Sequence, residues 1–112
     1  MDTYTRGLAI ASDLEALGTR ATLDPATASP PCVLIIPPNL TFDLQCDSVS
    51  ASWQLVALAS APNTADRLTW QALDLMVTNV HKVADVHDAT LVAYSLNGRT
   101  YPAYLLTFTE GI

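Results

Sequence analysis

Charged residues are scarce in this sequence, and basic residues are the scarcer sign. Only 14% of the 112 residues are Asp, Glu, Lys or Arg, and five basic residues stand against eleven acidic ones, for a net charge of −6. The basic residues are scattered along the chain. Because counterion release needs clustered cations, this distribution argues against nucleic-acid binding as the main task. An acidic surface suits basic partners, or like-charge repulsion that delays premature association.

Glycine and cysteine are also rare, which removes several kinds of functional motif. The four glycines lie too far apart to form a phosphate-binding loop. The two cysteines, Cys32 and Cys46, are fourteen residues apart, form no CxxC motif and have no histidine at zinc-ligand spacing. We expect two buried thiols in strands, and the sequence leaves a disulfide between them open.

No arrangement typical of an active site is present. The serines at 48–52 fall in an expected strand, and the GxSxG motif of a nucleophile elbow is missing. His81 and Asp85 stand at helical spacing with His87 nearby, but two ligands on a surface make a weak metal signal, so we expect solvated or structural roles. We therefore expect no catalytic residue, no metal site and no cofactor, and we do not expect an enzyme.

Long apolar runs are missing as well. No run approaches the ~20 residues needed to cross a bilayer, and residues 1–4 lack the cationic and apolar regions of a signal peptide. We expect no membrane contact, and a protein that stays in a cytoplasm unless an assembly carries it elsewhere. Half of the residues are hydrophobic, which is enough for one domain over residues 1–112 to bury a core. Its charge-poor surface suits a subunit that neighbours cover.

Two helices are predicted from the spacing of the apolar residues. The first spans residues 4–17 and ends at Gly18, which is placed for a left-handed C-cap. The second starts after the N-cap residue Asn63 and frays near residues 83–86. The residues expected to form the buried stripes are Leu8, Ala11, Leu14 and Leu17 in the first helix and Leu68, Ala72, Leu75, Met76, Val80 and Val83 in the second.

The first strands are predicted from alternation, from an apolar run and from proline. A short strand at 20–23 ends at the Asp-Pro dipeptide of 24–25, because the residue before proline avoids helical geometry. After a loop stiffened by three prolines, the apolar run 32–36 suits a strand covered on both sides. We expect the proline pair at 37–38 to break this strand and alternation to resume at 40–44.

Three further strands are predicted. Residues 48–59 are expected to form the longest strand, with Trp53 as a core anchor. Residues 89–96 and 100–109 flank Asn97-Gly98, a dipeptide that favours the positive φ values of a tight β-hairpin.

The order of these elements predicts an α+β fold. We expect a mostly antiparallel or mixed β-sheet with two α-helices packed on one face and a C-terminal β-hairpin. Pro102 removes a ladder donor, so the last strand should begin at an edge or at a bulge.

Five features of the chain suggest a family. After the first helix come residues 19–25 (TRATLDP), a loop that ends in the proline pair 30–31, and residues 37–43 (PPNLTFD). Trp53 lies in the next strand, and the Pro-Asn dipeptide at 62–63 precedes a helix rich in Leu and Asp. In these features the chain resembles the tail terminator proteins of long-tailed phages, particularly those of actinobacterial siphophages. The resemblance covers nearly the whole chain, and its motifs are scaffold features.

The resemblance implies a structural virion protein of the tail and neck, assembled in the host cytoplasm. Such terminators form a homohexameric ring that caps the tail tube, ends polymerisation of the tail tube protein, and joins the tail to the head-side connector or stopper protein. Genome DNA is then expected to pass through the lumen without specific binding. A closed ring needs two different complementary edges on each subunit. Exposed strand edges and the stiff loops at 24–31 and 37–39 are suited to supply them.

Rigid loops, the hairpin tip and one aromatic residue off its helix stripe are the expected contact sites with the partners. These residues are Asp24, Pro25, Pro30, Pro31, Pro37, Pro38, Asn39, Trp70, Asn97, Gly98 and Arg99.

Other functions remain open at this point. The first alternative is another neck protein, a head–tail connector or stopper. A tail tube subunit would need a longer β-sandwich and a long bridging loop, for which this chain has no room. A small ligand-binding or regulatory α+β domain would be a monomer or dimer with a pocket, and nothing in the sequence marks a pocket.

Overall fold

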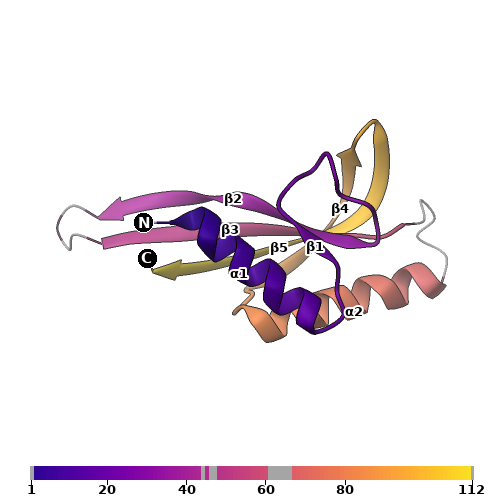
Figure 1. Cartoon of the computed structure of the whole chain (residues 1–112), viewed down its shortest axis with the longest axis horizontal. Helices are drawn as coiled ribbons and strands as arrows, with labels where there is room; N and C mark the ends of the chain where they lie inside the picture. Colours follow the sequence, from indigo (N-terminus) through magenta and orange to yellow (C-terminus); the bar gives the residue numbers. More distant parts are fainter. Residues whose placement is uncertain (1, 44, 46–47, 61–66, 112) are drawn as a thin grey trace.

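The helices and the sheet form two layers. The computed structural model describes residues 2–43, 45, 48–60 and 67–111. Its helices are α1 (Thr3–Ala16) and α2 (Arg67–Val83), and its strands are β1 (Ala21–Thr22), β2 (Cys32–Asp43), β3 (Ser48–Leu58), β4 (Asp88–Leu96) and β5 (Arg99–Gly111). The sheet order is β1-β2-β3-β5-β4, with only β1 and β2 parallel. Both helices cover the same face (Figure 1), so the α+β prediction with a mixed sheet is confirmed.

Capping interactions fix both ends of helix α1. The Asp2 side chain accepts a hydrogen bond from the Thr5 backbone N–H at 3.0 Å, which caps the helix. At the other end Gly18 has φ +87°, and the Thr19 N–H donates to the Leu14 carbonyl at 3.0 Å, the bond of a Schellman motif. The predicted Gly18 C-cap is confirmed.

The buried face of α1 is rotated from the prediction. Gly7, Ile10 and Leu14 are buried, whereas Leu8 and Leu17, expected in the stripe, are 45% and 44% exposed. A Cβ at Gly7 would lie 2.9 Å from Leu23 Cδ2. The small residue therefore lets the helix approach the sheet closely at this side, and this close packing selects the face.

Helix α2 shows the same kind of difference. Its buried residues are Thr69, Leu73, Met76, Asn79 and Val80, and the predicted stripe residues Leu68 and Leu75 are exposed. The buried Asn79 Nδ2 donates to Thr19 Oγ1, so a polar contact between α2 and the connection after α1 takes a place on the inner face that the prediction gave to leucine. The predicted N-cap Asn63 lies outside the described residues.

The predicted break of β2 at the proline pair is wrong. β2 is one strand of 12 residues, and its register with β3 shifts between Ile36, opposite Gln54, and Asn39, opposite Ser52. Two residues of β2 thus oppose one of β3, as in a β-bulge. Proline is tolerated at bulges and at strand edges, and β1 pairs only with Val33 and Leu34, so this stretch of β2 lies at an edge.

Strand β3 supplies the centre of the core. Ala51, Trp53, Leu55 and Ala57 are buried on its helix-covered face, as predicted, and the Trp53 ring stacks on Phe108 with centroids 6.2 Å apart. The prediction that this strand is the longest is wrong, because β5 has 13 residues and β3 has 11.

The β4–β5 hairpin has the predicted turn. Asn97 and Gly98 have φ of +51° and +81°. β5 is an interior strand, and Pro102 lies just past the end of β3, where its carbonyl accepts from the Ala59 N–H at 3.1 Å. Since the N and O of one strand residue point to the same side, the missing N–H of Pro102 faces away from β4. The proline therefore costs no hydrogen bond of the β4–β5 ladder. Residues 99–102 pair only with β4, because the pairing with β3 starts at Ala103, so the prediction that the last strand begins at an edge is confirmed.

A second apolar cluster lies on the face of the sheet away from the helices. It consists of Cys32, Leu34, Val56, Leu58, Leu96 and Ala103. Ala28 of the loop before β2, and Tyr94 and Tyr101 of the hairpin, pack against it. The hairpin curls over this face (Figure 1), which explains how these residues are buried without a third layer of helices.

Candidate assembly surfaces

The structure brings some of the predicted contact residues together. The loop at 24–31 meets the hairpin tip, because Asn97 Nδ2 donates to the Pro25 carbonyl at 3.1 Å. Asp24 braces the loop, since its side chain accepts from the Ala26 N–H at 2.9 Å. Arg20 also donates to the Ser29 carbonyl at 3.3 Å. Of the predicted set, Asp24, Pro25, Pro30, Pro31, Asn97, Gly98 and Arg99 therefore belong to this one end of the molecule.

The remaining predicted residues lie elsewhere. Pro37, Pro38 and Asn39 belong to β2 and not to a loop, which corrects the predicted loop at 37–39. Trp70 lies on α2 and is 63% exposed, as expected for an aromatic off the buried stripe. The structure thus separates the predicted contact set into three places and does not join them into one site.

One such place is a projecting β-ribbon that we call the arm, made of residues 36–43 of β2 and 48–52 of β3. It extends beyond the helices at one end of the molecule (Figure 1). Leu40 and Phe42 lie on the helix-covered face, because they pair with Ala51 and Val49, and Ala51 belongs to the core under the helices. Phe42 is 61% exposed. The arm therefore presents large apolar side chains where no helix covers the sheet.

The base of the arm is tied to α1. Arg6 Nε and Glu110 Oε1 are 2.9 Å apart, and a second bond joins the Arg6 guanidinium to Glu110 Oε2 at 3.1 Å. The hydrogen bond to Glu110 raises the pKa of Arg6, and the hydrogen bond from the Thr5 hydroxyl lowers the pKa of Asp2. Charged groups thus surround the base of the arm.

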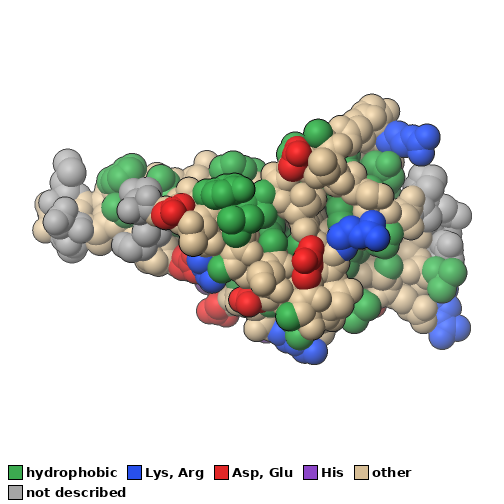
Figure 2. Space-filling view, in the orientation of Figure 1, with side chains coloured by type: hydrophobic (Ala, Val, Ile, Leu, Met, Phe, Trp, Pro, Cys, Tyr) green, Lys and Arg blue, Asp and Glu red, His purple; other side chains and the backbone are tan. Residues whose placement is uncertain are grey.

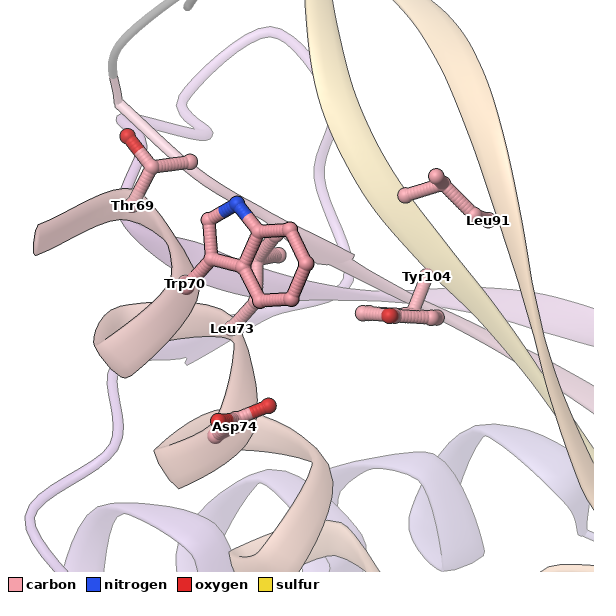
Figure 3. Close-up of a pocket in the computed structure, with 6 residues that line it drawn as sticks. All are labelled: Thr69, Trp70, Leu73, Asp74, Leu91 and Tyr104. Carbon is pink, nitrogen blue, oxygen red and sulfur yellow. The ribbon is translucent and has the colours of Figure 1, made fainter. Parts of the chain in front are cut away.

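A second place is the α2–β4 cleft, lined by Thr69, Trp70, Leu73, Asp74, Leu91 and Tyr104. In Figure 3, Trp70 and Leu73 of α2 stand across this cleft from Leu91 and Tyr104 of the sheet. Leu91 is 58% exposed. The cleft volume of about 80 Å³ is well below the 300–1,000 Å³ typical of small-molecule sites. Its apolar walls fit one or two side chains of a protein partner better than a cofactor.

The two sides of the sheet also carry unpaired strand edges. Among the described residues, the outer side of β4 has no strand partner, and β2 is unpaired beyond its short contact with β1. The β4 edge lies beside the α2–β4 cleft, and the unpaired part of the β2 edge belongs to the arm. Each edge thus combines free backbone groups with exposed apolar side chains, the combination that favours strand addition.

The ionisable groups show an uneven distribution. Figure 2 shows Lys or Arg side chains at the end of the molecule that holds the hairpin and the start of α2, where Arg67 and Arg99 lie. Asp2, Asp43 and Glu110 lie at the opposite side, on the arm and around its base. Asp74 lines the cleft, Asp88 begins β4, and Arg6 pairs with Glu110 at the base of the arm, so neither edge of the sheet carries charge of a single sign.

Other candidate chemistry finds little support in the structure. The described residues contain no group of three or more His, Cys, Asp or Glu side chains that could hold a metal ion. Cys32 has a free, buried thiol, and burial raises its pKa; Cys46 lies outside the described residues. Across the described ranges, neither helix is long and apolar enough to cross a bilayer.

Sequence reasoning missed Leu40, Phe42 and Leu91. The alternation of Leu40 and Phe42 marked them as one face of a strand, but only the position of α1 reveals that this face is uncovered. No family model matches the chain, and no curated protein or solved structure matches it.

Proposed function

We propose that this chain is a structural ring subunit with the role of a tail terminator in a long-tailed phage. In this role six copies form a ring in the neck of the virion, which caps the tail tube, stops its polymerisation and binds the head-side connector or stopper. The observation that supports this proposal most directly is the pair of different apolar surfaces on opposite edges of one sheet. A ring needs such a pair, because each subunit contacts its neighbours through two unlike surfaces.

The exposure of apolar residues favours an assembled subunit over a monomeric binding domain. Tyr4, Leu8, Leu17, Leu40, Phe42, Leu68, Trp70, Leu75 and Leu91 are large hydrophobic side chains that are each at least 36% exposed. Among these residues, Leu40 and Phe42 lie together on the arm and Trp70 and Leu91 lie together at the cleft, and exposed apolar side chains that gather in this way mark protein–protein contacts. The α2–β4 cleft, at about 80 Å³, is smaller than an ordinary small-molecule pocket, so this cleft does not favour a ligand-binding domain.

The charge of the chain suits the proposed lumen. At a net charge of −6, a ring of these subunits would repel the phosphate backbone of the genome. DNA would then pass without specific binding. A ring structure whose lumen is lined by Lys and Arg would contradict this part of the proposal.

Electron microscopy of intact particles that carry this chain, and of the purified chain mixed with tail tubes, tests the function. We expect one ring of six copies at the head-proximal end of the tube. Density in another neck ring would assign the chain to the connector or stopper role. The absence of both a ring and tube binding would refute a neck function.

A further inference from the structure

We propose that Asn97, at the tip of the β4–β5 hairpin, is a site of spontaneous deamidation, and that the loss of its amide releases the loop at 24–31 from the hairpin. The reaction consumes only water and yields ammonia, so it needs no enzyme and no cofactor. Asn97 has this property whether or not the chain belongs to a phage neck.

The dipeptide Asn97-Gly98 is the reactive element. Deamidation begins with attack by the backbone nitrogen of the following residue, and glycine has no side chain to hinder that attack. The Gly98 nitrogen loses its proton to solvent and bonds to Asn97 Cγ, while the Cγ–Nδ2 bond breaks and Nδ2 leaves as ammonia. Water then opens the cyclic imide. Cleavage of the bond to Cγ gives aspartate, and cleavage of the bond to the main-chain carbonyl gives isoaspartate, whose main chain runs through Cβ and Cγ.

The other asparagines of the chain are poorly placed for this reaction. Those at 39, 63 and 79 are followed by Leu, Thr and Val, whose side chains crowd the attacking nitrogen. Asn79 is also buried and donates to Thr19. Asn39 and Asn79 therefore serve as internal references for Asn97.

The turn must open before the reaction can proceed. Asn97 has φ +51°, and a left-handed residue has a positive ψ as well, whereas attack by the Gly98 nitrogen on Cγ needs a negative ψ. Residues 97–100 are all exposed, so opening of the tip uncovers no core side chain and costs little. The folded chain should therefore react through its open turn, more slowly than the unfolded chain.

The amide that the reaction removes ties the hairpin tip to the loop. Asn97 Nδ2 donates to the Pro25 carbonyl at 3.1 Å, and the Ala28 N–H makes a longer contact of 3.4 Å with the same carbonyl. A carboxylate has only acceptor oxygens, so aspartate would place an acceptor where the donor stood. Repulsion between this carboxylate and the Pro25 carbonyl then favours a loop that has moved away from the hairpin.

Isoaspartate disturbs the hairpin itself. Leu96 and Arg99 pair directly across the turn, and Leu96 is 5% exposed in the second apolar cluster. The additional main-chain atom lengthens the connection, so it no longer matches the tight turn that this pairing requires. The change of one asparagine thus alters the loop, the tip and the edge of the second apolar cluster together.

Ageing of the folded full chain tests the site. The wild-type chain is kept in warm, mildly alkaline buffer, and peptide mapping by mass spectrometry follows each asparagine, with electron-transfer fragmentation to distinguish isoaspartate from aspartate. The same chain unfolded in guanidinium establishes that the reaction is detected. Asn97→Gln is the matched control, because it keeps a side-chain amide but needs a larger and less favoured ring.

Hydrogen exchange tests the release of the loop. Ala26, Thr27 and Ala28 have N–H groups that bond within the loop, so their exchange reports its opening. It is measured in the aged chain and in Asn97→Asp, which reproduces the aspartate product without ageing. Circular dichroism verifies that both Asn97 variants are folded.

We expect Asn97 in the folded chain to convert measurably by the time the unfolded chain has reacted completely, before any change at Asn39 or Asn79. Asn97→Gln should stay intact over the same period. The loop amides should exchange about fivefold faster in the aged chain and in Asn97→Asp, the change expected for the loss of one hydrogen bond.

Two results would overturn the proposal. An Asn97 that is still intact in the folded chain when the unfolded chain has reacted, or that converts no faster than Asn39, refutes the deamidation site. Unchanged exchange of the loop amides in both the aged chain and Asn97→Asp refutes the release of the loop. Neither result bears on the neck function, which the microscopy above decides separately.

Discussion

The buried contact between Asn79 and Thr19 should be essential for the helix layer. Asn79 Nδ2 donates to Thr19 Oγ1, and the two residues are 4% and 5% exposed and sixty residues apart in the chain. Thr19 directly follows Gly18, the glycine that ends α1, so this bond joins the end of α1 to α2. In Asn79→Ala the threonine oxygen loses its donor in a site that water does not reach.

The magnitude follows from the burial of both groups. Leaving a buried polar group without its partner costs about 1–3 kcal/mol, and the truncated side chain adds a small cavity. We therefore expect Asn79→Ala to lower the free energy of unfolding by about 2–3 kcal/mol. That is a large share of the roughly 5–15 kcal/mol of a typical domain.

Urea unfolding followed by circular dichroism measures this loss. Because the m-value of small proteins is about 1–3 kcal/mol/M, the midpoint should fall by about 1 M or more while m stays constant. Thr19→Val removes the hydroxyl and keeps the shape, and the double variant completes a cycle with a coupling of about 1 kcal/mol. A loss below about 0.5 kcal/mol for Asn79→Ala, or strict additivity in the double variant, would refute the reasoning.

Four further outcomes are expected, each measured on the full chain. Trp53→Phe should cost less than the about 3–5 kcal/mol of Trp53→Ala, because it keeps an aromatic ring against Phe108 while removing an indole N–H that has no partner among the described residues; equal losses in urea unfolding would contradict this. Gly98→Ala should destabilise by about 1–2 kcal/mol, since its φ is +81°, and an unchanged melting temperature would contradict it. Arg6→Ala and Glu110→Ala should show a coupling of only about 0.5–1 kcal/mol that weakens in high salt, because both side chains are partly exposed. The pKa of Asp2 is lowered from its ordinary 3.8 in the folded state, so its stabilising effect is present above pH 3.8 and is lost as the pH falls through the lowered value; Asp2→Ala should lack that part of the pH dependence of thermal unfolding.

Features that depend on a few neighbouring residues could be predicted. Gly18 ends α1 and Asn97-Gly98 forms the hairpin turn, because positive φ is a property of single residues with small side chains. The alternation of β3 around Trp53 marked its buried face, since strand geometry sends successive side chains to opposite sides. The α+β arrangement followed from the order of such elements.

The faces of the helices could not be predicted in the same way. Both helices carry apolar residues on more than one side, and Leu8 and Leu75 are exposed while Gly7 and Asn79 are buried. Packing against the sheet is more stable when a small residue allows close approach and when a buried polar group finds a hydrogen-bond partner. The spacing of apolar residues reveals neither of these effects.

The candidate surfaces were predictable only in part. The prolines and the turn marked the loop at 24–31 and the hairpin tip, and the structure joins these two through the Asn97 contact with Pro25. The proline pair at 37–38 was misread as a loop, because the sequence does not show that β1 stops early and leaves that part of β2 at an edge. The proposed partners remain predictions from the sequence resemblance.

The sequence by itself determined the elements, the turn chemistry and the low charge of this protein, because each depends on residue type or on contacts within a few residues. The tertiary structure alone decided which apolar side chains remain exposed. Phe42 and Leu91 are residue types usual in a core, yet both are exposed. The arm extends beyond the helices at Phe42, and Leu91 lies at the open cleft between α2 and β4. Exposure is a property of what packs above a residue, and that depends on segments distant in the chain.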